Sequence, residues 1–282
     1  MSRIGDLYDD LFSFENRWFW KNKFTINTSY PVHKPFSKPF VLPNGTKVND
    51  VNDWVLSTFN FEENSTFLDA GCGNGQSSFL IHNTFKSSGV GISLSSKEIK
   101  LAQTIADEKG VSHKLNFREN SFEDVFNKSF DFIIAIESMK HSPNLKASIR
   151  NLVKHLKPNG ELIIVDDLFI DGHSNLNQSL IADFKDYWAV TKLYASTDFT
   201  NLSDQENLTL VSSINFTPNI KSHSTAFINL KLFGLKLIKI FTFQKYKKRI
   251  LNVFIGGFIQ DKLYRKGVLE YRGLVFKKMD NV

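Results

Sequence analysis

The sequence predicts an α/β fold built on a seven-stranded, mostly parallel sheet with helices on both faces. Three observations predict it. Short apolar runs alternate with helical stretches between residues 65 and 166, which is typical of a doubly wound parallel sheet. A glycine-rich turn at 69–75 directly follows the first apolar run. The alternating segment 268–276 is expected to add a last strand, with an antiparallel orientation left open.

The elements of the regular region follow one another in order. Five strands are expected at 66–69, 89–93, 114–117, 130–135 and 161–165. A helix is expected over 95–109, because Ser95 with Glu98 three residues later forms a capping-box pattern. A second helix, over 144–156, should end before a turn made of Lys157, Pro158, Asn159 and Gly160. Beyond residue 166, helices at 176–190 and 226–264 and a strand at 208–214 are expected.

Residues 1–50 are expected to form an N-terminal arm or lid outside the core layers. A stretch rich in aromatic residues is followed by Pro31, Pro35, Pro39 and Pro43, a spacing that opposes both helix and central strand. Residues 51–282 then form the main domain, in which 222–264 is expected to be a helical lid insertion. Arm and insertion together would cover a pocket and exclude water from it.

The composition is that of a globular domain with a mild basic excess. The 282 residues include 35 Lys and Arg against 29 Asp and Glu, with a pI of about 9.2. We interpret the excess as solvated surface, with nucleic acid or an anionic membrane as alternatives. One cysteine, Cys72, excludes an intramolecular disulfide and fits the reducing cytoplasm. No uncharged apolar run reaches 18 residues and the N-terminus lacks a signal-peptide core, so no membrane span is expected.

The glycine-rich turn indicates a ligand site. It carries Gly71 and Gly73 at the point where the first strand leads into a helix. Glycines let the backbone turn sharply and approach a ligand closely, and ligands collect at this edge of α/β sheets. The sequence has no GxxxxGK[ST] phosphate loop, and Asp69 stands just before the first glycine. An acid there suits a ligand with a cationic amino-acid end better than a pyrophosphate.

Four segments in order resemble one family. Residues 69–75, 91–95, the run from Phe130 to His141, and 156–162 resemble the motifs of class I S-adenosylmethionine (SAM) dependent methyltransferases. Small-molecule members are the most similar: sugar and polyketide O-methyltransferases, and tocopherol, sterol and terpene C-methyltransferases. The resemblance implies a Rossmann-like fold and methyl transfer from SAM to a small acceptor of natural-product metabolism, with S-adenosyl-L-homocysteine as the product.

The resemblance also implies which residues bind the cofactor. They are Asp69, Gly71, Cys72, Gly73, Ser93, Leu94, Glu98, Asn120, Ser121, Phe122 and Glu137. Many family members place an acid for the ribose hydroxyls where this chain has Ser93, so Glu98 is expected to take that role, with simple helix capping as the alternative. Asn120, Ser121 and Phe122 are expected at the adenine. No metal is expected.

His141 and Asp166 are the expected catalytic residues. His141 follows the fourth strand and could take a proton from an acceptor hydroxyl, while Asp166 at the end of the fifth strand could orient it or act beside it. A histidine that only shapes the pocket wall is the alternative. We therefore prefer O-methylation. C-methylation of an apolar isoprenoid is the alternative, and Lys140, which replaces the glutamate of cyclopropane-forming relatives, argues against cyclopropanation. A nucleic-acid binder or a non-catalytic SAM-binding protein is the alternative from another class; no NPPY-like motif follows the fourth strand.

The segment 229–250 can be read in two ways. On a helix, Lys231, Lys236 and Lys239 fall within about 140° of arc. The opposite face holds Leu232, Phe233, Leu235, Leu237 and Ile238. Such a helix can lie on an anionic membrane. We favour a lid helix that packs its apolar face on the sheet or pocket. The expected partners are a small-molecule acceptor and, weakly, a membrane surface, with no nucleic acid.

Overall fold

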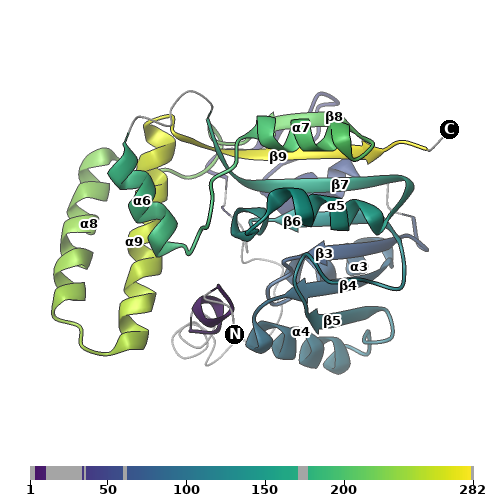
Figure 1. The fold of residues 1–282 in the computed structure, drawn as a ribbon, viewed down its shortest axis with the longest axis horizontal. Helices are drawn as coiled ribbons and strands as arrows, with labels where there is room; N and C mark the ends of the chain where they lie inside the picture. The colour runs from purple at the N-terminus through teal and green to yellow at the C-terminus, as the bar shows by residue number, and fades with distance from the viewer. Residues whose placement is uncertain (1–3, 11–33, 35, 60–61, 171–176, 281–282) are drawn as a thin grey trace.

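The computed structural model describes residues 4–10, 34, 36–59, 62–170 and 177–280. Its main sheet has seven strands in the order β5-β4-β3-β6-β7-β9-β8 (Figure 1). The strands are β3 (Thr66–Ala70), β4 (Ser88–Ser93), β5 (Leu115–Glu119), β6 (Phe130–Ile136), β7 (Leu156–Phe169), β8 (Leu208–Asn215) and β9 (Leu269–Lys278). The first five are parallel, and β9 is antiparallel to both β7 and β8. The expected fold class is confirmed.

Helices cover both faces of this sheet. They are α2 (Val51–Thr58), α3 (Gln76–Phe85), α4 (Ser96–Glu108), α5 (Leu145–Lys154), α6 (Gln178–Tyr187), α7 (Ser196–Gln205), α8 (Thr225–Ile240) and α9 (Lys245–Arg265). Successive strand residues face opposite sides, so Phe67 packs in a core with α2, α3 and α4, whereas Leu68 packs in a second core with α5 and α7. Both cores hold the strands in place beneath the sheet edge where the glycine-rich turn lies.

Two local expectations are corrected. The turn expected at 157–160 lies inside β7: the pairing with β6 steps from Phe130 and Leu156 to Phe132 and Glu161, so the extra residues form a bulge around Asn159, whose φ is 60°. The helix expected over 226–264 is two helices, α8 and α9, separated by a turn that residues 241–244 form without glycine or proline.

The expectation that the arm stays outside the core is wrong in part. Within residues 1–50, β1 (Phe40–Val41) pairs with β2 (Lys47–Val48), and Leu42 and Val48 are buried in the first core. Residues 4–10 form a short helix. Most of the aromatic residues of the arm, from Phe12 to Tyr30, lie outside the described residues.

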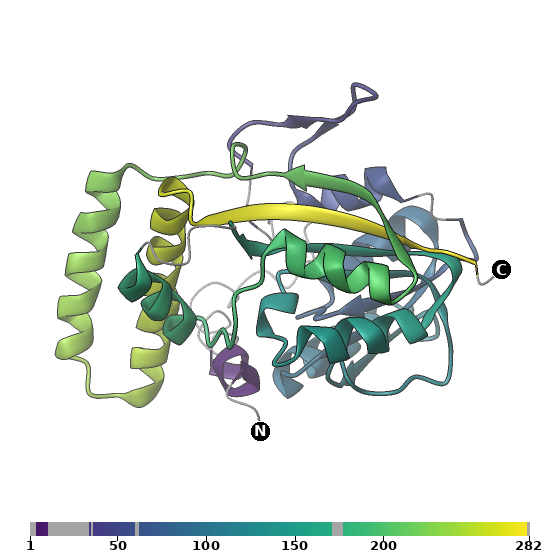
Figure 2. The same cartoon turned by 45° about the horizontal axis from the view of Figure 1, so that its top comes forward.

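The helical insertion stands beside the sheet. Figures 1 and 2 show α6, α8 and α9 beyond the carboxyl ends of β6 and β7, with α8 outermost and the helix of residues 4–10 between α9 and α4. The expectation that α8 packs its apolar face inward is wrong in part: Phe233, Leu237 and Ile238 are exposed, whereas Leu232 is buried and Leu235 packs against the first core. No helix in the described part of the chain is long and apolar enough to cross a membrane.

Candidate active site

The glycine-rich turn is shaped by two kinds of glycine. Gly71 and Gly75 have φ of 95° and 82°, and a Cβ on them would lie 2.3 Å from the Ser138 Cβ and 2.7 Å from the Phe117 ring. These two glycines are therefore required by packing. Gly73 has φ of 51°, but its Cβ would meet only the Glu98 carboxylate, at 3.7 Å. The backbone at Gly73 thus faces open space bordered by Glu98, as a ligand cradle requires.

Glu98 points toward the end of β4. Ser93 Oγ donates to Glu98 Oε2 over 2.9 Å, and Ser95 N donates to Ser93 Oγ over 3.2 Å. Ser95 Oγ accepts from Glu98 N, so the cap exists, but the reciprocal bond of the expected capping box is replaced by the one to Ser93. Glu98 is therefore placed between the turn and the strand end, where a carboxylate can accept from ligand hydroxyls.

Asp69 is not aimed at the open space. Its side chain is 2% exposed, and Ser78 Oγ of α3 donates to its Oδ2 over 2.6 Å. Burial raises the pKa of Asp69 to about 7. The expected direct contact with a cationic ligand end is thus replaced by a contact to α3 beneath the turn. Cys72 is also buried, and burial raises the pKa of its thiol, so it is a packing residue.

The loop after β5 meets β4 at the same edge. Asn120 N donates to Ser93 O over 3.2 Å, which brings Asn120 beside Ser93 and half-buried Leu94. Ser121 N donates to Asp124 Oδ2 over 2.5 Å, and Phe122 packs against the second core while its carbonyl accepts from Asn151 Nδ2. Ser93, Glu98, Gly73 and Asn120 therefore share one corner, and the adenine role of 120–122 stays a prediction.

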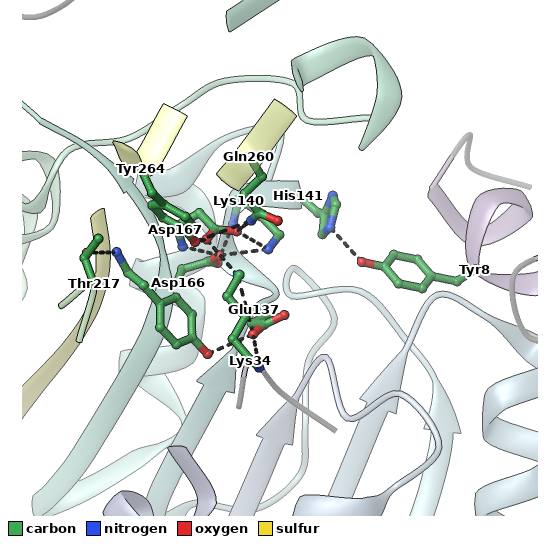
Figure 3. A network of polar contacts seen from close by, with 11 residues as sticks. Tyr8, Lys34, Glu137, Lys140, His141, Asp166, Asp167, Thr217, Gln260 and Tyr264 are labelled. Atoms are coloured by element: carbon green, nitrogen blue, oxygen red, sulfur yellow. Dashed lines mark hydrogen bonds and ion pairs between the residues drawn. The ribbon is translucent and has the colours of Figure 1, made fainter. Parts of the chain in front are cut away.

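His141 forms a pair with Tyr8 of the N-terminal helix (Figure 3). It ends a 3-10 turn, Met139–His141, beyond β6, and its Nε2 lies 2.9 Å from the Tyr8 hydroxyl. Burial and the charge of Lys140 lower the pKa of His141 to about 3, and burial raises the pKa of Tyr8 well above its usual value. Both groups are therefore neutral, so the bond joins a hydroxyl to an uncharged imidazole, and the imidazole tautomer decides which of the two donates.

The expected pairing of Asp166 with His141 is wrong. Asp166 accepts from the backbone N–H groups of Lys140 and Asp167, and Lys140 Nζ lies 3.3 Å from Asp166 Oδ1. His141 Nδ1 is buried, and within the described residues no group forms a hydrogen bond of ordinary geometry with it. Lys140 takes the carboxylates because a buried ammonium requires compensating charge.

Asp167 is the centre of the buried charge cluster. It accepts from Lys140 Nζ over 2.7 Å, Lys34 Nζ over 2.8 Å, Gln260 Nε2 over 2.5 Å and the Tyr264 hydroxyl. The two lysines hold the pKa of Asp167 well below its usual range, although burial opposes this. The cluster joins the arm, β7 and α9 at one point (Figure 3).

Glu137 lies at the end of β6 with a left-handed backbone, φ 53°, held by the bond from its N–H to Val165 O. Its Oε1 accepts from the Tyr271 hydroxyl over 2.8 Å and lies 3.6 Å from Lys34 Nζ. The Lys34 ammonium stands 4.3 Å from the centroid of the Tyr271 ring. A non-glycine residue with this φ is strained and is typical of functional sites.

Several residues of this site were missed from the sequence. Asp167 could have been found as a second acid in an apolar strand, and Tyr264 and Tyr271 flank the beginning of the strand expected at 268–276. Tyr8 and Lys34 carry no local signal, because only the fold brings them to residues more than 100 positions away. No cluster in the described ranges could hold a metal ion.

Comparisons with known proteins agree with this geometry. A family model for a methyltransferase domain matches residues 61–209. A sterol 24-C-methyltransferase of Aspergillus fumigatus is 31% identical over 126 residues, 44% of this chain and 33% of that protein. A ubiquinone biosynthesis O-methyltransferase of Rickettsia canadensis is 32% identical over 125 residues, 43% of this chain and 50% of that protein. The alignments thus span a third to a half of these relatives.

A solved structure shares the fold over nearly its whole length. Geranyl diphosphate C-methyltransferase from Streptomyces coelicolor A3(2) has a TM-score of 0.71 at 13% sequence identity, covering 98% of this chain and 96% of that one. At this identity the likeness concerns the fold alone, so the chemistry has to be argued from the side chains at the sheet edge.

Proposed function

The chain belongs to the class I SAM-dependent methyltransferases, whose methyltransferase-domain model it matches over residues 61–209, and from this premise we propose that it methylates a hydroxyl group of a small-molecule acceptor. The observation that carries the proposal is the pair formed by Tyr8 and His141. A hydroxyl is already hydrogen-bonded to a neutral imidazole at the carboxyl edge of the sheet. An acceptor hydroxyl can make the same bond when the arm releases Tyr8.

The residues at the glycine-rich turn fit the cofactor. The open side of Gly73 admits a ligand close to the backbone, and Glu98 beside it offers carboxylate oxygens for ribose hydroxyls. Ser93, Leu94 and the loop 120–122 border the same corner. When bound there, SAM supplies an electrophilic methyl group on its sulfonium.

His141 orients the acceptor and receives its proton. With a pKa of about 3 it is a weak base, so it does not ionise a hydroxyl beforehand. As the acceptor oxygen is methylated, its O–H becomes far more acidic than such an imidazolium, and the proton then passes to Nε2. Asp167 and Glu137 favour the positive charge on the ring. Much of the rate comes from holding the hydroxyl in line.

The arm and the helical insertion are proposed to cover the acceptor. Asp9 Oδ1 accepts from Ser95 Oγ over 2.5 Å, and Arg249 of α9 donates to Asp10 Oδ2 over 2.5 Å. The short helix is therefore tied both to the cofactor side and to the insertion. We retain residues 1–50 as the arm and 51–282 as the domain with its insertion at 222–264. The single cysteine, buried and free, supports a reducing compartment such as the cytoplasm.

C-methylation of an isoprenoid is the second candidate, and one observation favours it. The ring of Tyr271 already accepts a cation, the Lys34 ammonium at 4.3 Å, and the Glu137 carboxylate is bonded to the same tyrosine. Aromatic rings and a carboxylate stabilise positive charge that develops on an alkene carbon.

A panel assay tests the proposal. The protein is incubated with methyl-labelled SAM and acceptors that carry phenol, sugar or polyketide hydroxyls, or only isoprenoid double bonds. We expect S-adenosyl-L-homocysteine together with an O-methylated product, identified by mass spectrometry and NMR. A methyl group found on carbon would select the second candidate. Cofactor binding without turnover on any acceptor would contradict both.

The ribose role of Glu98 has a test of its own. Glu98→Ala is expected to weaken SAM binding by about 1–3 kcal/mol, the range of hydrogen bonds to charged groups, measured by calorimetry. Glu98→Gln, which keeps an acceptor oxygen for Ser93, serves as the matched variant and should lose less. A circular dichroism melt reports any stability that is lost with the side-chain bond to Ser93, because the α4 cap uses the Glu98 backbone N–H and stays in both variants. Unchanged affinity with lowered stability would show that Glu98 is a structural residue only.

A further inference from the structure

The outer face of α8 is apolar and exposed. The helix packs on its neighbours through buried Ile228 and Leu232 and through Lys239, whose ammonium lies 4.7 Å from the centroid of the Tyr187 ring of α6. Its other side carries large apolar side chains in solvent, which are Phe227, Leu230, Phe233, Leu237, Ile238, Ile240 and Phe241. We call these residues, together with Phe243 of the following turn, the α8 face.

The α8 face is continuous. At 100° per residue its helical members fall within about 160° of arc, centred opposite the buried Ile228 and Leu232. Phe241 is 74% exposed and Phe243 is 90% exposed. Figures 1 and 2 show α8 as the outermost element on this side, with α9 between it and the sheet. Contiguous apolar surface of this kind marks an interaction site.

The stretch of sequence that contains the α8 face has basic residues and no acidic ones. Residues 207–260 contain eight Lys and Arg and no Asp or Glu, which leaves 27 basic and 29 acidic residues in the rest of the chain. The net charge of +6 therefore resides in this segment. Lys231 and Lys236 flank the two edges of the α8 face, Lys236 with its Nζ 3.6 Å from Asp183 Oδ2 of α6, and exposed Lys247 and Lys248 follow its turn.

We propose that the α8 face docks on an anionic lipid bilayer. The helix has 16 residues and is about 24 Å long, and it lies flat with its apolar face among the acyl chains and with Lys231, Lys247 and Lys248 at the headgroups. A second copy of the chain is a poor occupant, because two such faces would bring the exposed lysines beside the face, Lys231, Lys236, Lys247 and Lys248, against the same four of the other copy. The docking surface lies apart from the sheet edge and does not depend on the methyl-transfer proposal.

Vesicle sedimentation tests the docking. The full chain is mixed with vesicles of phosphatidylcholine alone or with about 30% phosphatidylserine, at low and high salt. We expect cosedimentation with the anionic vesicles and partial release by salt. Phe241→Ser combined with Phe243→Ser should lower the partition coefficient at least about tenfold. Lys247→Glu combined with Lys248→Glu should reduce binding to the anionic vesicles.

Matched controls separate docking from loss of folding. Val125→Ser removes an apolar side chain that is 77% exposed on a different surface, and it should leave sedimentation unchanged. Melting temperature and SAM affinity should stay unaltered in all these variants. Wild-type protein that stays in the supernatant, or a double serine variant that binds equally well, overturns the proposal. A concentration-dependent dimer that the serine variants abolish, or a monomer that ignores both vesicle types and leaves a protein partner as occupant, also overturns it.

Discussion

Gly73→Val is expected to abolish SAM binding, with at least about a hundredfold loss of affinity by calorimetry. The reason is geometric. The Cβ position of Gly73 is open except for the Glu98 carboxylate at 3.7 Å, so a branched side chain would fill the space that a ligand needs at the turn. The φ of 51° adds backbone strain of about 1–2 kcal/mol for any L side chain.

A matching substitution at Gly110 separates the two effects of Gly73→Val, which are backbone strain and occlusion of the ligand space. Gly110 has φ of 67° with nothing within 4 Å of its Cβ position, and it lies beyond the far end of α4. Gly110→Val should therefore lower the melting temperature by a similar amount while SAM affinity stays unchanged. Equal affinity in the Gly73 variant and the wild type would refute the placement of the cofactor at this turn.

His141→Ala is expected to lower kcat by about 10²–10⁴, the usual contribution of a positioned acid or base, while SAM affinity is retained. The imidazole is the group to which the Tyr8 hydroxyl is hydrogen-bonded, and its loss leaves an acceptor hydroxyl without orientation or a proton acceptor. Tyr8→Phe, the companion variant, should retain turnover, because the acceptor displaces the Tyr8 hydroxyl. A His141 variant with full turnover would be incompatible with the proposed role.

The pH profile provides an independent check of His141. Its pKa of about 3 keeps the ring neutral from pH 5 to 9, so kcat should show no histidine ionisation in that range. Asp69, with a pKa of about 7, gains its charge as the pH rises through neutrality. Any change in SAM affinity near pH 7 should therefore increase binding toward higher pH and disappear in Asp69→Asn. If the pH dependence near pH 7 persisted in Asp69→Asn and disappeared in His141→Ala, it would contradict the neutral state of His141.

The sheet and the cofactor corner could be predicted because their signals are local. Apolar runs, the glycine spacing and the Ser95 cap are each contained in a few residues, and Glu98 comes to Ser93 from five positions away. The ribose role proposed for Glu98 follows from Ser93, which stands where many family members have an acid. The hydrogen bond between Ser93 and Glu98 supports that role because it holds the carboxylate at the strand end. The turn at 157–160 was misread because a bulge and a loop share the same residues.

The acceptor side could not be predicted because its residues meet only in the folded chain. Tyr8 reaches His141, and Lys34 reaches Asp167, each across 133 positions. Asp166 was assigned to His141 by its place at a strand end, whereas Lys140, one residue from His141, attracts both carboxylates once the cluster is buried. Helix periodicity also grouped apolar residues of α8 on one face, whereas Leu232 and Leu235 pack on the first core and Phe233, Leu237 and Ile238 lie in solvent.

The position of β9 between β7 and β8 has a consequence for synthesis of the chain. β8 has no sheet neighbour other than β9, and β7 keeps an open edge until residues 269–278 exist, about 100 residues after β7 is complete. At roughly 5–20 residues per second, a ribosome takes several seconds over that interval. During that time the nascent chain presents the unpaired apolar edge of Ile163, Ile164 and Val165, which is the segment that chaperones would have to shield.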